Sequence, residues 1–178
     1  MNALTILLTL FLASRVDLLY DNITITMAMP QYRSLCILSI IIIATLYAYQ
    51  AWILFQRQNI NNKVYRCMII FTWSIMCFGA FAPYHQNHVD LISQIHVICS
   101  MSSCLLVLVV LLLYQWHIQQ TSLFSLSAQH FLRTGIVLLI MMYVGFGRVN
   151  GYLEIAYSIV AGGSFALHRY KNKRIHSK

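Results

Sequence analysis

Four polar side chains recur at helical spacing within one hydrophobic stretch of the chain. Ser93, His96, Ser100 and Ser103 are separated by three, four and three residues, a spacing that places side chains along one face of an α-helix. Asp90 comes one turn before Ser93 and continues the same line. The hydroxyl, imidazole and carboxylate groups of this polar stripe are suited to hold a polar ligand by hydrogen bonds.

One acid, Glu154, lies inside the last hydrophobic stretch. An ionised carboxylate facing lipid is costly, so we expect Glu154 to face other helices and to find a partner there. Three bases are candidates for that partner: His96, Arg148 and Arg33. Of these, His96 and Arg148 are favoured.

These residues predict one polar cluster, with two interpretations of its role. Its members are Asp90, Ser93, His96, Ser100, Arg148, Asn150 and Glu154. In one interpretation the cluster is a packing seam, because hydrogen bonds between helices in lipid contribute about 0.6 kcal/mol each. In the other it lines an outward-facing pocket for a lipid, an ion or a small ligand.

A catalytic interpretation depends on histidines in the short connection before Asp90. His85, His88 and His96 offer nitrogen ligands of the kind that zinc accepts. A zinc ion there could activate water against a lipid ester or amide, with Glu154 as general base. However, a His-x-x-His pair is common by chance, and no second ligand pair lies on another predicted helix. We therefore expect no cofactor, with zinc as the alternative.

The elements that must position these residues are apolar. The 178-residue chain is 60% hydrophobic and 9% charged, whereas soluble proteins carry roughly 25% charged residues. About 20 mainly apolar residues span a bilayer. The predicted spans are residues 3–20, 34–55, 67–83, 91–116, 131–147 and 151–168. The sequence thus predicts an all-α polytopic transmembrane bundle of six helices in a single membrane domain, 1–178, with a basic tail at 169–178.

The first span decides whether the bundle has six transmembrane helices or five. Its apolar run, Ala3–Ala13, reaches span length only by continuing past Arg15 and Asp17. A cleaved signal peptide would leave five helices. No positive residue precedes Ala3, which favours a retained helix.

Charge asymmetry predicts the orientation. Connections 56–66 and 117–130, the tail 169–178 and Arg133 together carry nine bases on one side of the predicted bundle. The positive-inside rule makes that side cytoplasmic, with both termini. The four acids then fall on or near the outer face. The net charge of +8 is explained by topology and anionic headgroups, so no nucleic-acid partner is expected.

Several short motifs resemble one membrane protein family. They are Gly79–Pro83, Ile92–His96, Asn150–Glu154, and Thr26–Met29 leading through Tyr32-Arg33. The layout is similar to bacterial members of the Frag/DRAM/Sfk-like superfamily of small six-helix membrane proteins, in the branch known as a domain of unknown function. The resemblance implies a six-helix fold, an outer-leaflet polar cluster around His96 and Glu154, and a bacterial plasma membrane. It implies no activity.

The sequence therefore favours a non-enzymatic, multi-pass membrane protein. Membrane lipids are its expected partners, and the polar cluster would bind a lipid, a small ligand or a membrane protein. A metal-assisted lipid hydrolase and a structural subunit of a membrane complex are the alternatives.

Overall fold

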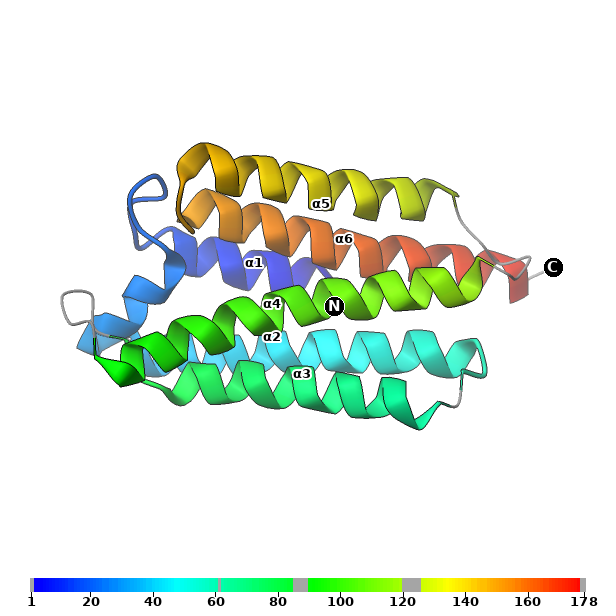
Figure 1. Ribbon diagram of the computed structural model, residues 1–178, viewed down its shortest axis with the longest axis horizontal. Coiled ribbons are helices and arrows are strands. Elements are labelled where there is room, and N and C mark those ends of the chain that lie inside the picture. The colour runs from blue at the N-terminus through cyan, green and yellow to red at the C-terminus, as the bar shows by residue number, and fades with distance from the viewer. Residues whose placement is uncertain (1, 61, 85–89, 120–125, 177–178) are drawn as a thin grey trace.

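Long helices run side by side along one axis and form an all-α bundle (Figure 1). The computed structural model describes residues 2–60, 62–84, 90–119 and 126–176, and no strand occurs among them. In chain order the elements are α1 (Asn2–Ala13), the 3₁₀ helix η1 (Ile23–Ala28), α2 (Pro30–Arg57), α3 (Lys63–Phe81), α4 (Leu91–Ile118), α5 (Leu126–Phe146) and α6 (Gly151–His176).

Four of the described helices, α2, α3, α4 and α5, are long and apolar enough to cross a bilayer. The protein is therefore an integral membrane protein. Helix α6 is equally long but less apolar, and it packs against α1, α2, α4 and α5. Between Gly151 and Arg169 only Tyr152 and Ile159 are exposed. A helix surrounded by other helices needs fewer lipid-compatible side chains, which explains its composition.

The prediction of a first span at 3–20 is wrong. Helix α1 ends at Ala13 and is 12 residues long, which is about 18 Å and too short for a hydrocarbon core of about 30 Å. The chain turns there because polar groups bond locally, with Asp17 accepting a hydrogen bond from the Leu19 N–H at 3.0 Å. Figure 1 shows α1 beginning about halfway along the bundle.

The other five predicted spans correspond to α2–α6, and two of them continue past the end of their helix. Helix α3 stops at Phe81, ahead of the predicted end at 83, because the residue before Pro83 is disfavoured in helical conformation. Helix α5 stops at Phe146, where Gly147 adopts a positive φ of 65°. That conformation is typical of the residue that ends a helix.

All four acids of the chain lie at one end of the bundle. The four acids, Asp17, Asp21, Asp90 and Glu154, lie with η1 and with the connections that follow α1, α3 and α5, at the left of Figure 1. We call this the acidic end. The opposite end holds the α2–α3 connection and the C-terminal part of α6, with Arg57, Lys63, Arg66 and Arg169. We call it the basic end.

Candidate functional site

A cavity of about 440 Å³ lies between α4, α5 and α6 in the half of the bundle nearer the acidic end. Its size is within the usual range for ligand pockets, about 300–1,000 Å³. The lining side chains come from these three helices, from the α5–α6 connection, and from η1 and its N-cap: Asn22, Thr24, His96, Val97, Ser100, Met101, Cys104, Leu105, Leu108, Ile136, Leu139, Ile140, Tyr143, Val149, Leu153, Glu154 and Tyr157.

Polarity changes along the length of this cavity. Asn22, Thr24, His96, Ser100 and Glu154 gather near the acidic end. From His96 the α4 wall continues over 12 residues to Leu108, which is about 18 Å at 1.5 Å per residue, and becomes aliphatic. The cavity therefore has a polar end and an apolar end, as an amphipathic ligand has.

The open side of the cavity faces outward between α4 and α5. Three of its lining residues on α4, Val97, Met101 and Leu105, are exposed on the surface of the bundle, and so are Ile140 and Tyr143 on α5. In a membrane these side chains meet lipid, so the cavity is accessible from the bilayer.

His96 joins two helices at the polar end. Its Nδ1 lies 2.7 Å from the Gly79 carbonyl oxygen and 3.1 Å from the Ala82 carbonyl oxygen. Carbonyl groups only accept, so Nδ1 carries a proton and donates to them. These are carbonyls at the C-terminal end of α3, which lack partners within the helix. Nε2 faces Ser100, whose hydroxyl lies 3.5 Å away.

Close approach of α3 and α4 makes this capping contact feasible. A methyl group at Gly79 would lie 3.0 Å from Cys99 Cβ and 3.5 Å from the Ser100 nitrogen. The missing side chain at Gly79 thus lets α4 bring the His96 ring, which is 1% exposed, against the end of α3.

Glu154 lies in the first turn of α6, half-buried and on the cavity wall. Its carboxylate accepts a hydrogen bond from the Ile23 N–H at the start of η1, at 2.5 Å. The segment that carries Ile23 is held in place by backbone bonds to α6, in which the Gly151 N–H donates to the Asp21 carbonyl at 2.8 Å. A carboxylate near a helix N-terminus also interacts favourably with the helix dipole.

The predicted ion pair of Glu154 is not formed with any described residue. Arg148 instead donates to the Leu19 carbonyl at 3.4 Å and lies over the Tyr20 ring, 5.4 Å from its centroid. His96 donates to the α3 carbonyls. The prediction of a pair with His96 or Arg148 is therefore wrong, because the segment between α1 and α2 supplies partners for both Arg148 and Glu154.

The structure brings three of the predicted cluster residues, His96, Ser100 and Glu154, to one cavity. The other four are not among the described residues that line it. Asp90 caps α4 by accepting from the Ser93 N–H at 2.7 Å. Asn150 caps α6 by accepting from the Leu153 N–H at 3.0 Å, and it donates to the Leu19 carbonyl at 3.4 Å.

The proposed zinc ligands are only partly described. His85 and His88 lie outside the described residues, whereas His96 uses Nδ1 for the α3 carbonyls. Within the described part of the chain, no group of three His, Cys, Asp or Glu side chains could hold a metal ion. The zinc site stays a prediction.

Sequence reasoning missed the residues from two other elements. Asn22, the N-cap of η1, and Thr24 within η1 reach the cavity, and Tyr143 reaches it from α5. No pattern in the sequence predicts that the loop after α1 returns to α6. Tyr157 could have been predicted, because it follows Glu154 by three residues and so lies on the same face of the helix.

No family model, curated protein or solved structure matches this chain. The chemistry of the cavity is therefore argued from its own residues. The lining offers a carboxylate, an imidazole and hydroxyl groups at one end and an apolar channel at the other. Such a site can bind an amphipathic molecule.

Proposed function

We propose that this protein is a non-enzymatic membrane protein that binds an amphipathic lipid in the cavity between α4, α5 and α6. The observation that carries the proposal is the polarity gradient of the cavity. Polar groups gather around Glu154 and His96, and the α4 wall, which runs about 18 Å from His96, ends in the aliphatic side chains Leu105 and Leu108. A lipid headgroup would occupy the first region and an acyl chain the second.

The polar end also restricts the headgroup. The described lining residues include the carboxyl group of Glu154 and no Arg or Lys, because Arg148 bonds to the loop after α1. Acceptor groups are best matched by hydrogen-bond donors, so a headgroup with hydroxyl or ammonium groups fits better than a purely anionic one.

Access from the bilayer supports a lipid over a water-soluble ligand. The opening is rimmed by exposed apolar side chains of α4 and α5, including Leu105 and Ile140. A membrane lipid could enter sideways without leaving the hydrocarbon region. A soluble ligand would meet this apolar rim first.

Orientation is part of the proposal. With the basic end at the cytoplasm, as the positive-inside rule requires, the acidic end and the polar part of the cavity lie in the outer leaflet. The C-terminal end of α6 would be cytoplasmic. The plasma membrane of a bacterium is the setting that the family resemblance implies.

A matched pair of substitutions on α5 tests the site. Ile140 lines the cavity, whereas Leu138 does not, and the two side chains are similarly exposed, at 57% and 53%. Ile140→Trp places an indole in the opening, and Leu138→Trp adds the same group to a lipid-facing surface. Each protein is purified in detergent, washed, and assayed for lipid retained per mole.

We expect Ile140→Trp to retain one lipid fewer per protein than the parent and Leu138→Trp. Equal retention in both variants would place the lipid elsewhere on the bundle. Absence of bound lipid in the parent would favour the structural-subunit alternative and refute the proposal.

A further inference from the structure

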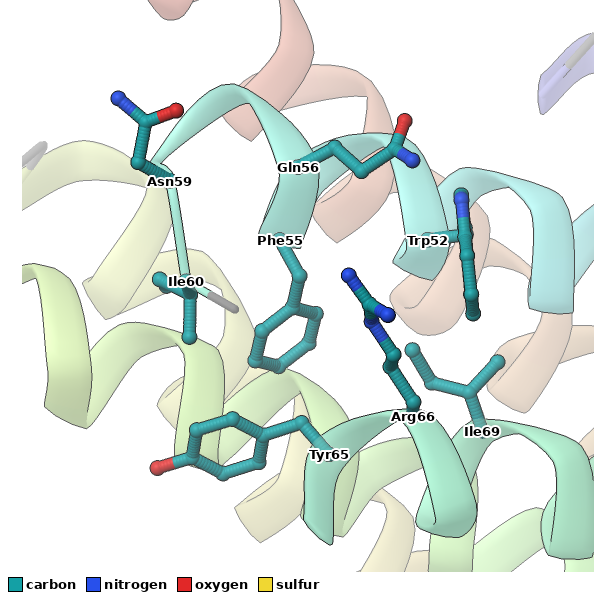
Figure 2. Close-up of a pocket in the computed structure, with 8 residues that line it drawn as sticks. All are labelled: Trp52, Phe55, Gln56, Asn59, Ile60, Tyr65, Arg66 and Ile69. Atoms are coloured by element: carbon teal, nitrogen blue, oxygen red, sulfur yellow. The ribbon is translucent and has the colours of Figure 1, made fainter. Parts of the chain in front are cut away.

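A second hollow, separate from the cavity, lies at the basic end between α2 and α3 (Figure 2). Its volume is about 370 Å³ and its walls are Trp52, Phe55, Gln56, Asn59, Ile60, Tyr65, Arg66 and Ile69. Figure 2 shows the Arg66 side chain reaching from α3 into the space between Phe55 and Trp52 of α2. The guanidinium carbon is 5.4 Å from the centroid of the Trp52 ring.

An apolar hollow of about 290 Å³ continues from it toward the middle of the bundle. The two share Trp52 and Ile69, and the second is otherwise lined by Thr45, Ala48, Tyr49, Ile70 and Trp73. From Arg66 to Trp73 the α3 wall covers seven residues, about 10 Å. Together they form one groove, the α2–α3 groove, with a cation and amide groups at its head and aromatic and aliphatic side chains along its length.

Arg66 has no acid near it. Among the described residues the only side-chain partner of its guanidinium is the Trp52 ring, and the four acids of the chain lie at the acidic end. A guanidinium presents five N–H donors in a planar fork that matches phosphate oxygens. Because Arg66 is exposed, its guanidinium is available to an anion from outside the chain.

We propose that the α2–α3 groove binds an anionic phospholipid, with its phosphate on Arg66 and one acyl chain along the groove. Gln56 and Asn59, both exposed at the rim, supply further donors for the headgroup. Trp52 lies where an interfacial tryptophan is expected, beside the charged headgroup.

The apolar extension distinguishes a lipid from a soluble anion. Ile69 is buried on the floor of the groove, whereas Tyr49, Ile70 and Trp73 are exposed along its sides. A soluble phosphate would occupy the head of the groove alone. A phospholipid satisfies Arg66 and covers the apolar part at the same time.

This site complements the cavity at the acidic end. There the lining carries a carboxylate and no Arg or Lys among its described residues, whereas here it carries a guanidinium and no carboxylate. The cavity therefore favours a headgroup with hydroxyl or ammonium donors and the groove favours an anionic one, so one site can fail without the other.

Fluorescence quenching in vesicles tests the proposal. The substitutions Trp73→Phe and Trp116→Phe leave Trp52 as the only tryptophan, since the chain has three. The protein is placed in phosphatidylcholine vesicles that contain an equal small fraction of either phosphatidylglycerol or phosphatidylcholine with brominated acyl chains. Bromine quenches only nearby tryptophan, so the ratio of the two quenching signals reports selective binding beside Trp52.

Arg57 provides the matched control. It ends α2 at the same end of the bundle and does not line the groove. We expect Arg66→Gln to lower the affinity for brominated phosphatidylglycerol about tenfold or more, as loss of charge-assisted hydrogen bonds does, and Arg57→Gln to change it much less. Arg66→Lys keeps the positive charge but lacks the planar fork of donors, so its affinity should lie between those of the two glutamine variants. It tests the same site if Arg66→Gln does not fold.

Equal quenching by the two brominated lipids in the parent would overturn the proposal. Equal losses in Arg66→Gln and Arg57→Gln would also overturn it, because general surface charge would then explain the preference. Excess soluble glycerol phosphate should leave the quenching unchanged, and reversal by it would assign the site to a free anion instead.

Discussion

Gly135 on α5 controls how closely α5 approaches α6, and its replacement by alanine gives a measurable test of the bundle. A methyl group at this position would lie 2.6 Å from Val160 Cγ1 and 2.7 Å from Val160 Cγ2. Carbon atoms pack at about 3.5–4.0 Å. Val160 is buried at 8% exposure and has one strongly preferred rotamer in a helix, so it cannot swing aside.

The cost follows from these contacts. Overpacking of this kind destabilises by about 1–3 kcal/mol, and the higher helix propensity of alanine offsets up to about 1 kcal/mol. We expect Gly135→Ala to lower the free energy of unfolding by up to about 2 kcal/mol. Adding Val160→Ala removes both crowding methyls, so the double variant should be more stable than the sum of the two single changes predicts.

Gly145 supplies the control on the same helix. A methyl group there meets no atom within 4 Å, so Gly145→Ala should leave the stability unchanged or raise it slightly. The assay is equilibrium unfolding in mixed micelles with increasing dodecyl sulfate. If Gly135→Ala were indistinguishable from Gly145→Ala, or if Val160→Ala gave no rescue, the α5–α6 contact described here would be refuted.

Three further predictions concern the cavity and the orientation. His96→Ala should lower the free energy of unfolding by about 1–3 kcal/mol, because two carbonyls at the end of α3 lose their donor. Ser100→Ala should lower it by less than about 1 kcal/mol. Thermal unfolding in detergent measures both variants, and equal losses of stability would contradict the capping role of His96. Glu154→Gln should fold normally, because its amide oxygen still accepts a hydrogen bond from the Ile23 N–H. Glu154→Ala should be less stable by about 1–3 kcal/mol, because that N–H loses its acceptor. Equal melting temperatures of the two variants would contradict the role of this hydrogen bond. Lys63→Cys in a cysteine-free background should react with a membrane-impermeant maleimide only after the cells are opened, and labelling of intact cells would reverse the proposed orientation.

The helices could be predicted from the sequence because apolar runs of span length have few alternatives to a helix in lipid. Helix α1 was predicted wrongly because Ala3–Ala13 is apolar but too short, and its length was extended through Arg15 and Asp17. In the structure those polar residues belong to a turn. Local hydrogen bonding thus ended the helix where hydrophobicity alone did not.

The shared location of His96 and Glu154 was predictable because both are polar residues in apolar helices, and such residues face the interior. Their partners were not. Glu154 bonds to Ile23, 131 residues away, and Arg148 bonds to Leu19. These contacts depend on how the loop after α1 folds back. Every residue carries the same backbone groups, so a sequence does not indicate which of them will bond to a given side chain.

Native mass spectrometry of the intact protein, released gently from its own membrane, tests the central claim most directly. A lipid in the cavity between α4, α5 and α6 predicts a retained lipid mass in the parent protein, and the loss of one lipid mass in Ile140→Trp that does not occur in Leu138→Trp. A bare chain at its calculated mass, under conditions that keep the bundle folded, would contradict the account.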